Sequence, residues 1–161
     1  MSSAPAARPG PPPFLAPPDF PAEVWDRSLA ELEGRVVEKG AYGTGSVAWL
    51  ARALVSPLRQ LGAAELRLLL TQGRGLAWTV PLALERLLAE PLAAADYGPG
   101  DLLTALLAAL AEVEPAAWGA GWRDRLGRVL AAARAHVGLL PDARRERVAG
   151  DLDAAAEQFG L

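Results

Sequence analysis

Apolar positions recur at helical spacing through most of the chain, in segments that glycines and prolines separate. The segment 63–72 lies between Gly62 and Gly73, and the segment 46–56 ends before Pro57. Glycine and proline commonly terminate helices, and apolar residues three or four positions apart share one helix face. The pattern therefore predicts one helix over each segment.

The helix predicted to begin after Ser46, its expected N-cap, carries Val47, Leu50, Leu54 and Val55 on one face. We expect this face to be buried, because a globular protein buries the apolar stripe of an amphipathic helix.

Tryptophans occur at five positions: Trp25, Trp49, Trp78, Trp118 and Trp122. Trp49 and Trp78 lie among leucines and valines and are expected in the core. Trp118 and Trp122 are four residues apart and can share a helix face, either as core residues or as exposed binding anchors.

The densest apolar stretch runs over residues 76–88 and predicts a central, mostly buried helix. Proline lacks a backbone N–H and is best tolerated in the first helical turn. The favoured interpretation therefore starts the helix with Thr79 as its cap and Pro81 in the first turn. A start at Leu76 is the alternative, in which Pro81 interrupts the hydrogen bond to the residue four positions back.

The remaining helices begin at polar caps or follow prolines. They are predicted over 20–32 with Ser28 as an internal cap, from Leu102 to about 113 with Asp101 near the N-terminus, from about 115 to 136 with a break near Gly119 or Gly121, and from Asp142 to 159. With 34 Ala, 28 Leu and no Ile or Asn, the composition favours helix throughout. We predict an all-α fold, a compact antiparallel bundle of five to six helices arranged as stacked hairpins.

The first 21 residues contain eight of the 14 prolines. So many positions without a backbone donor predict a disordered tail over 1–21, followed by a single helical domain over 22–161. The segment before Pro18 includes Arg8 but no apolar run of signal-peptide length, and no transmembrane stretch follows. We expect a cytoplasmic protein with no membrane association.

Few side chains in the chain are suited to catalysis. There is one histidine, His136, and there are five serines and no cysteine. A nucleophile, a base and an orienting carboxylate are needed together for triad chemistry, and thiolate zinc sites need cysteine. We therefore expect no enzyme activity, no metal and no cofactor.

Charge is unevenly distributed although the net charge is only -3. An acidic surface near 85–114 and a basic one near 123–147 are one interpretation, and ordinary solvated helix faces are the other. The acidic overall charge makes nucleic acid an unlikely ligand. The acids of the first segment are Glu85, Glu90, Asp96, Asp101, Glu112 and Glu114, and the arginines of the second are Arg123, Arg125, Arg128, Arg134, Arg144, Arg145 and Arg147.

Several short sequence words follow one another in the middle of the chain. They are Ser28-Leu-Ala-Glu31-Leu-Glu33-Gly34, Glu65-Leu66-Arg67, Gln72, Gly75-Leu76, Pro81-Leu82-Ala83-Leu84-Glu85, Pro91-Leu92 and Asp96-Tyr97-Gly98-Pro99-Gly100-Asp101-Leu102-Leu103.

In their order and spacing these words resemble the helical immunity proteins of contact-dependent growth inhibition systems, over about residues 28–118. The resemblance implies a small cytoplasmic protein that binds the C-terminal toxin domain of a cognate effector, with a nuclease as the expected toxin. It implies that the protein inhibits the toxin domain by occupying its surface rather than by catalysing a reaction. It also implies that the protein has no small-molecule substrate.

Two groups of residues are singled out within these words or directly beside them. Glu90, Asp96, Tyr97 and Asp101 are expected to contact the partner, because acids and an aromatic gather in a loop expected to be exposed. The architectural residues, explained by turn and cap geometry alone, are Gln72, Gly75, Pro81, Pro99 and Gly100.

Two further functions stay open at this point. A helical adaptor or regulatory domain would bind a different protein, outside toxin immunity. A nucleic-acid binder would use the seven arginines of segment 123–147, and its affinity would fall steeply with salt.

Overall fold

The computed structural model describes residues 17–35, 37, 45–114 and 121–161. Within these residues the regular elements are all helices, and the only strand-like pairing is an isolated bridge between Ser28 and Pro57. The predicted all-α class is confirmed. The α-helices are α1 (Leu29–Leu32), α2 (Ser46–Val55), α3 (Ala63–Thr71), α4 (Leu76–Ala89), α5 (Asp101–Ala111), α6 (Trp122–His136) and α7 (Asp142–Phe159).

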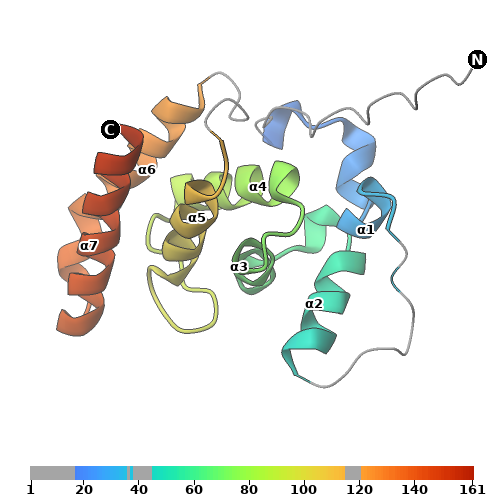
Figure 1. Cartoon of the computed structure of the whole chain (residues 1–161), viewed down its shortest axis with the longest axis horizontal. Coiled ribbons are helices and arrows are strands. Elements are labelled where there is room, and N and C mark those ends of the chain that lie inside the picture. The colour runs from blue at the N-terminus through green and yellow to red at the C-terminus, as the bar shows by residue number, and fades with distance from the viewer. Residues whose placement is uncertain (1–16, 36, 38–44, 115–120) are drawn as a thin grey trace, which may run out of the picture.

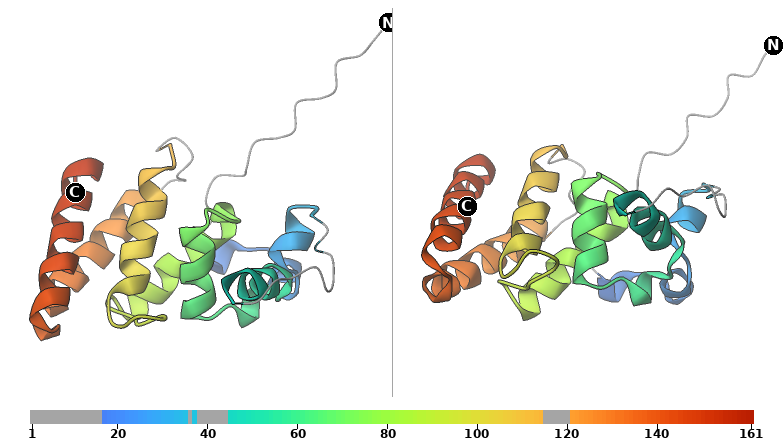
Figure 2. Two further views of the ribbon diagram at one scale, coloured as in Figure 1. Left: turned by 60° about the horizontal axis from the view of Figure 1, so that its bottom comes forward. Right: turned by 90° about the horizontal axis from the view of Figure 1, so that it is seen from below.

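The helices stack in two layers. In one layer α3 packs against α5 and α5 against α7, while α4 packs against α6 in the other (Figures 1 and 2). Helix α4 also contacts α3 and α5. The helices therefore form stacked hairpins, as predicted, and α5 lies between α3 and α7 in the first layer.

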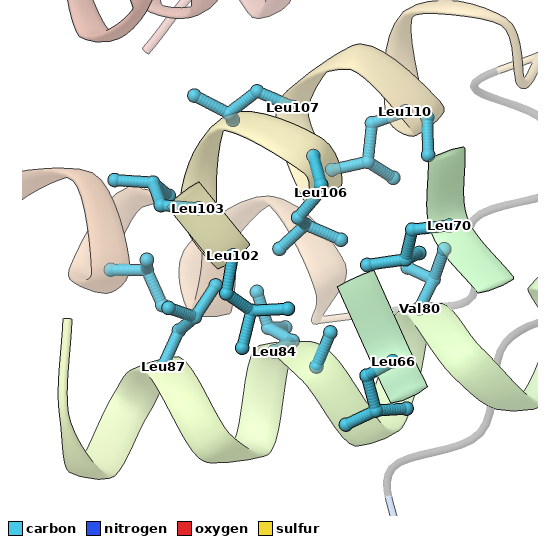
Figure 3. Packing of buried hydrophobic residues seen from close by; sticks show 14 of the residues in the cluster. Leu66, Leu70, Val80, Leu84, Leu87, Leu102, Leu103, Leu106, Leu107 and Leu110 are labelled. Carbon is cyan, nitrogen blue, oxygen red and sulfur yellow. The ribbon is translucent and has the colours of Figure 1, made fainter. Parts of the chain in front are cut away.

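Leucines from α3, α4 and α5 fill the space between the layers (Figure 3). Leu84 of α4 and Leu102, Leu106 and Leu110 of α5 are completely buried. Burying a leucine side chain contributes about 1.5–3 kcal/mol, so these contacts fix the position of α5 within the layer. Helix α4 is central, as the segment 76–88 predicted: it contacts α3, α5 and α6, and only Glu85 and Arg86 of that segment are exposed.

The packed part of the chain begins earlier than the expected boundary after Pro21. Short 3-10 helices cover η1 (Pro17–Asp19) and η2 (Ala22–Asp26), and Phe20 between them is 6% exposed. The Phe20 ring meets the Trp78 ring edge-on at 5.2 Å. Burial of the apolar Phe20 side chain therefore orders this segment despite its high proline content. Residues 1–16 of the predicted tail lie outside the described residues.

The helix predicted over 20–32 is divided into η2 and α1. Ser28 caps α1, and its Oγ accepts a hydrogen bond from the Glu31 amide at 3.2 Å. The cap residue has extended backbone angles, which a continuous helix would not allow. The internal cap at Ser28 is confirmed, and the continuous helix is not.

Helix α4 begins at Leu76, so the favoured start near Thr79 is wrong. The Thr79 hydroxyl donates to the carbonyl oxygens of Gly75 and Arg74, at 3.1 and 3.2 Å. A capping oxygen would accept from an amide instead. Pro81 consequently lies inside the helix, where it is buried and leaves the Ala77 carbonyl without its usual donor.

Helix α2 is less buried than expected. Leu54 is 6% exposed, but Val47 is 61%, Val55 49% and Trp49 37% exposed. Among the helices α2 contacts mainly α1 and α3, so its other faces lie at the surface of the described structure. The core position predicted for Trp49 is therefore wrong, while Trp78 packs against the core as expected.

Helix α6 begins at Trp122, after Gly121 in the left-handed conformation. Trp122 is buried in the core, and the break expected near Gly119 or Gly121 stays a prediction. Residues 115–120, which include Trp118 and the expected start of this helix, lie outside the described residues.

Gly75 joins α3 to α4 with a φ of +59°. A Cβ at this position would lie 2.6 Å from Cδ2 of Leu29, so Gly75→Ala adds a steric clash to backbone strain. We expect the free energy of unfolding to fall by about 2–4 kcal/mol, measured by chemical denaturation.

Gly73→Ala is the matched control. Gly73 has a φ of +63° in the same turn, but its Cβ would meet nothing within 4 Å. We expect only the backbone cost of about 1–2 kcal/mol. Equal destabilisation by the two substitutions would contradict the close approach of Leu29 to Gly75.

Candidate functional site

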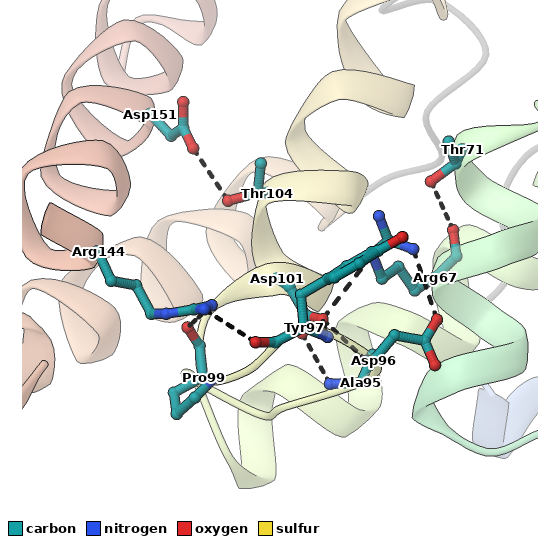
Figure 4. A network of polar contacts seen from close by, with 10 residues as sticks. All are labelled: Arg67, Thr71, Ala95, Asp96, Tyr97, Pro99, Asp101, Thr104, Arg144 and Asp151. Carbon is teal, nitrogen blue, oxygen red and sulfur yellow. Dashed lines mark hydrogen bonds and ion pairs between the residues drawn. The ribbon is translucent and has the colours of Figure 1, made fainter. Parts of the chain in front are cut away.

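The loop between α4 and α5 is organised by one carboxylate (Figure 4). Asp101, the first residue of α5, accepts hydrogen bonds from the amides of Ala95 at 2.7 Å, Asp96 at 2.9 Å and Tyr97 at 2.8 Å. Consecutive amides that converge on an anion form a compact, oriented turn. Asp101 therefore holds the loop 95–101, rather than capping the helix that it begins.

These bonds set the charge state of Asp101. Burial of the Asp101 carboxyl raises its pKa, but the amides of Tyr97, Ala95 and Asp96 together outweigh burial and lower the pKa below its ordinary value of 3.8. The carboxylate is therefore ionised at neutral pH. Its side chain is 10% exposed, so the expected exposed contact at Asp101 is instead an internal support.

Arg67 of α3 lies against the same loop. Its guanidinium carbon is 4.4 Å from the centre of the Tyr97 ring, and its nitrogens lie 3.5 Å from Asp96 Oδ2 and 3.8 Å from Asp101 Oδ2. A guanidinium over an exposed aromatic face contributes about 0.5–1 kcal/mol. Arg67 thereby orients Tyr97, which remains 72% exposed.

Arg144 of α7 reaches the loop from the opposite side. Its guanidinium donates to the carbonyl oxygens of Tyr97 at 2.8 Å and Pro99 at 3.2 Å. Gly98, with a φ of +138°, allows this approach, because a Cβ there would lie 2.9 Å from the guanidinium. The loop is thus held between α3 and α7.

Gly100 sets the distance between the loop and α7. Its φ is +89°, and a Cβ at Gly100 would lie 2.9 Å from Cγ2 of Val148. Its amide donates to the Leu92 carbonyl at 3.1 Å. Thr104 of α5 then donates to Asp151 of α7 at 2.9 Å, which ties the two helices one turn further along.

A groove of about 850 Å³ lies between the loop, α3, α5 and α7. Small side chains of α5 hollow it, and arginines from α3 and α7 line its sides. Its lining is Arg67, Thr71, Tyr97, Pro99, Gly100, Asp101, Thr104, Ala105, Ala108, Pro141, Ala143, Arg144, Arg147 and Val148.

The structure brings together only some of the residues singled out in the sequence. Asp96, Tyr97, Asp101, Pro99 and Gly100 meet in the loop and at the groove. Glu90 is exposed at the C-cap of α4, outside this hydrogen-bond network. Gln72 and Gly75 flank the turn from α3 to α4, and Pro81 lies within α4.

The acids near the loop do not form an unpaired acidic surface. Asp96 and Asp101 lie within ion-pair distance of Arg67, and Glu85 pairs with Arg125. Ordinary helix faces with neutralising neighbours therefore describe this segment better than a continuous acidic patch.

The seven arginines of segment 123–147 are also mostly engaged. Three pair with Glu85, Asp153 and Asp142, and Arg123 and Arg144 donate to backbone carbonyls. Arg128 and Arg147 form no hydrogen bond or ion pair with any described residue. A basic surface built from all seven, as a nucleic-acid binder would need, is not assembled.

The described residues contain neither a metal-ligand cluster nor a membrane-spanning helix. Among residues 17–35, 37, 45–114 and 121–161, no three histidine, aspartate or glutamate side chains cluster as metal ligands would. No helix within that same part of the chain combines the length and apolar character needed to cross a membrane.

Comparison with known proteins identifies the family. The family model of CDI immunity proteins, where CDI denotes contact-dependent growth inhibition, matches residues 31–120, which is more than half of the chain. The chain belongs to this family of immunity proteins. No curated protein and no solved structure matches the chain. Helix α7, with Arg144 and Arg147, lies beyond the matched residues.

Two residues of the site were not predicted to contact the loop. Arg67 and Arg144 come from α3 and α7, 29 and 47 residues away in sequence from the loop residues they contact. Helical periodicity does not report such pairings. The one local signal was the spacing of Gly98 and Gly100, which indicates close approach of another element without naming it.

Asp101→Asn tests the support of the loop. The variant removes the charge and one acceptor oxygen, and its amide group would face backbone donors. We expect a loss of about 1.5–3 kcal/mol in the free energy of unfolding at pH 7, measured by denaturation.

The pH dependence follows from the lowered pKa of Asp101. The stabilisation is present above about pH 4 and is lost as pH falls through the folded-state pKa, so wild type and Asp101→Asn converge in acid. Asp153→Asn, which removes an exposed ion pair with Arg134, should cost less than about 1 kcal/mol. A constant difference between wild type and Asp101→Asn down to low pH would exclude this role.

Proposed function

We propose that this chain neutralises the C-terminal toxin domain of a cognate CDI effector by binding it in the cytoplasm and occupying its working surface. Membership of the CDI immunity family is the observation that carries the proposal. A stoichiometric inhibitor needs a rigid, complementary surface and no reactive group of its own. The loop 95–101 offers such a surface.

The proposed contact centres on Tyr97. Its ring is 72% exposed, yet Arg67 stacks on it and Asp101 holds its backbone. An aromatic side chain that is already ordered loses little conformational entropy on binding. Tyrosine and arginine are also the residues that most often dominate binding energy at protein interfaces.

The other expected contacts take different parts in the proposal. Asp96 lies at the edge of the loop, where Arg67 neutralises it. Glu90 is exposed and unpaired among the described residues, so it can meet a cation of the toxin at the rim. Asp101 contributes indirectly, because its carboxylate holds the backbone of Tyr97 in place.

The nuclease character of the toxin is supported by the sequence resemblance alone. The expected alternative, a helical adaptor outside toxin immunity, shares the same fold, and no contact in the structure favours it over immunity.

Tyr97→Ala tests the proposed contact. We expect its dissociation constant for the toxin domain encoded beside this gene to rise about 30-fold, equivalent to about 2 kcal/mol, by calorimetry. Cells co-expressing the toxin should survive with the wild-type chain and grow poorly with the variant. The free energy of unfolding should change by less than about 1 kcal/mol, because only the arginine–ring contact is lost.

Two matched variants separate binding from folding. Tyr97→Phe keeps the ring over Arg67 and should bind within about threefold of wild type. Trp49→Ala removes an exposed aromatic of α2 and should leave affinity unchanged. Unchanged affinity of Tyr97→Ala would remove the loop from the interface, and cells killed despite the wild-type chain would refute the proposed function.

A further inference from the structure

The groove beside Tyr97 carries positive charge that the protein does not neutralise. Arg144 donates only to carbonyl oxygens, which orient its guanidinium without cancelling the charge. Arg147, one helical turn further along α7, is exposed and has no hydrogen bond or ion pair among the described residues. The Asp151 carboxylate, also on α7, instead accepts a hydrogen bond from Thr104.

The only carboxylate that lines the groove is already engaged. Asp101 accepts three amides and lies 3.8 Å from Arg67. Arg67 is also paired with Asp96, so the uncompensated positive charge of the groove comes from Arg144 and Arg147, neither of which has a carboxylate partner among the described residues. Arginine pairs well with carboxylates because its planar donors match both oxygens.

We propose that the groove receives an acidic segment of the toxin domain, with an aspartate or glutamate carboxylate bound by Arg147 and Arg144. This inference rests on the proposed function and adds the chemistry of the partner surface.

The floor of the groove favours a peptide over nucleic acid. Ala105 and Ala108 of α5, with Val148 of α7, form an apolar surface between the arginines. Such a surface suits the methylene groups of an acidic side chain, whereas a phosphate backbone needs several free cations in a row. Of the three arginines that line the groove, only Arg147 has no partner among the described residues, and the chain carries a net charge of -3.

Charge reversal at Arg147 tests the inference against a control on α6. Arg147→Glu should weaken binding of the purified toxin domain at least about tenfold, measured by calorimetry. Arg128→Glu reverses another exposed, unpaired arginine outside the groove, in the other helix layer, and should change affinity by less than about threefold. The affinity of Arg147→Lys for the toxin domain should lie between those of wild type and Arg147→Glu, because lysine keeps the charge but cannot bind a carboxylate in the bidentate geometry of arginine.

Salt and compensating toxin variants give two further readouts. Raising salt from about 50 to about 300 mM should weaken wild-type binding more than Arg147→Glu binding. One surface Asp→Arg or Glu→Arg variant of the toxin should bind Arg147→Glu better than it binds wild type. The melting temperature of each variant shows that the fold is intact.

The possible failures are distinguishable. Wild-type binding with no loss in Arg147→Glu, or with equal loss in Arg128→Glu, would overturn the acidic-segment inference and leave the proposed function standing. Absence of wild-type binding would refute the proposed function and this inference with it. Binding of a short DNA or RNA duplex that depends on Arg147, with toxin affinity unchanged, would assign the groove to nucleic acid and overturn the inference.

Discussion

The candidate site depends on a single partly buried carboxylate at the start of α5. Asp101 accepts the amides of Ala95, Asp96 and Tyr97, and so converts the connection from α4 into a turn with a defined shape. A buried charge is tolerated only where hydrogen bonds replace its hydration, and the loop provides them. Completely buried leucines fix α5 in the core, so the turn is attached to a rigid helix.

The stacking of the helical hairpins then brings the arginines of the neighbouring helices to this loop. Helices α3 and α7 flank α5, and each sends one arginine to the loop (Figure 4). Gly98 and Gly100 have no side chain, which lets α7 come close enough for Arg144 to contact the loop. The outcome is an exposed tyrosine that is ordered by its neighbours, at the edge of a groove lined by arginines. Such a surface can bind another protein without first having to reorganise.

Local sequence signals predicted most of the fold and part of the site. Apolar periodicity and glycine stops placed α3 at its observed bounds, and the loop around Asp96–Asp101 was singled out for its acids and aromatic. Local sequence signals failed where contacts between segments far apart in the sequence determine the position of a residue. Phe20 is buried because Trp78 lies beside it, and Asp96 and Asp101 meet Arg67 of α3. No pattern within one segment records which element packs against it.

A crystal structure of the chain bound to the toxin domain encoded beside its gene addresses the central claim most directly. The account predicts that the Tyr97 ring becomes buried against the toxin, that a toxin carboxylate lies within hydrogen-bond distance of Arg147, and that the three amide bonds to Asp101 persist. A complex in which the toxin lies on α2, with Tyr97 still exposed and the groove empty, would contradict it.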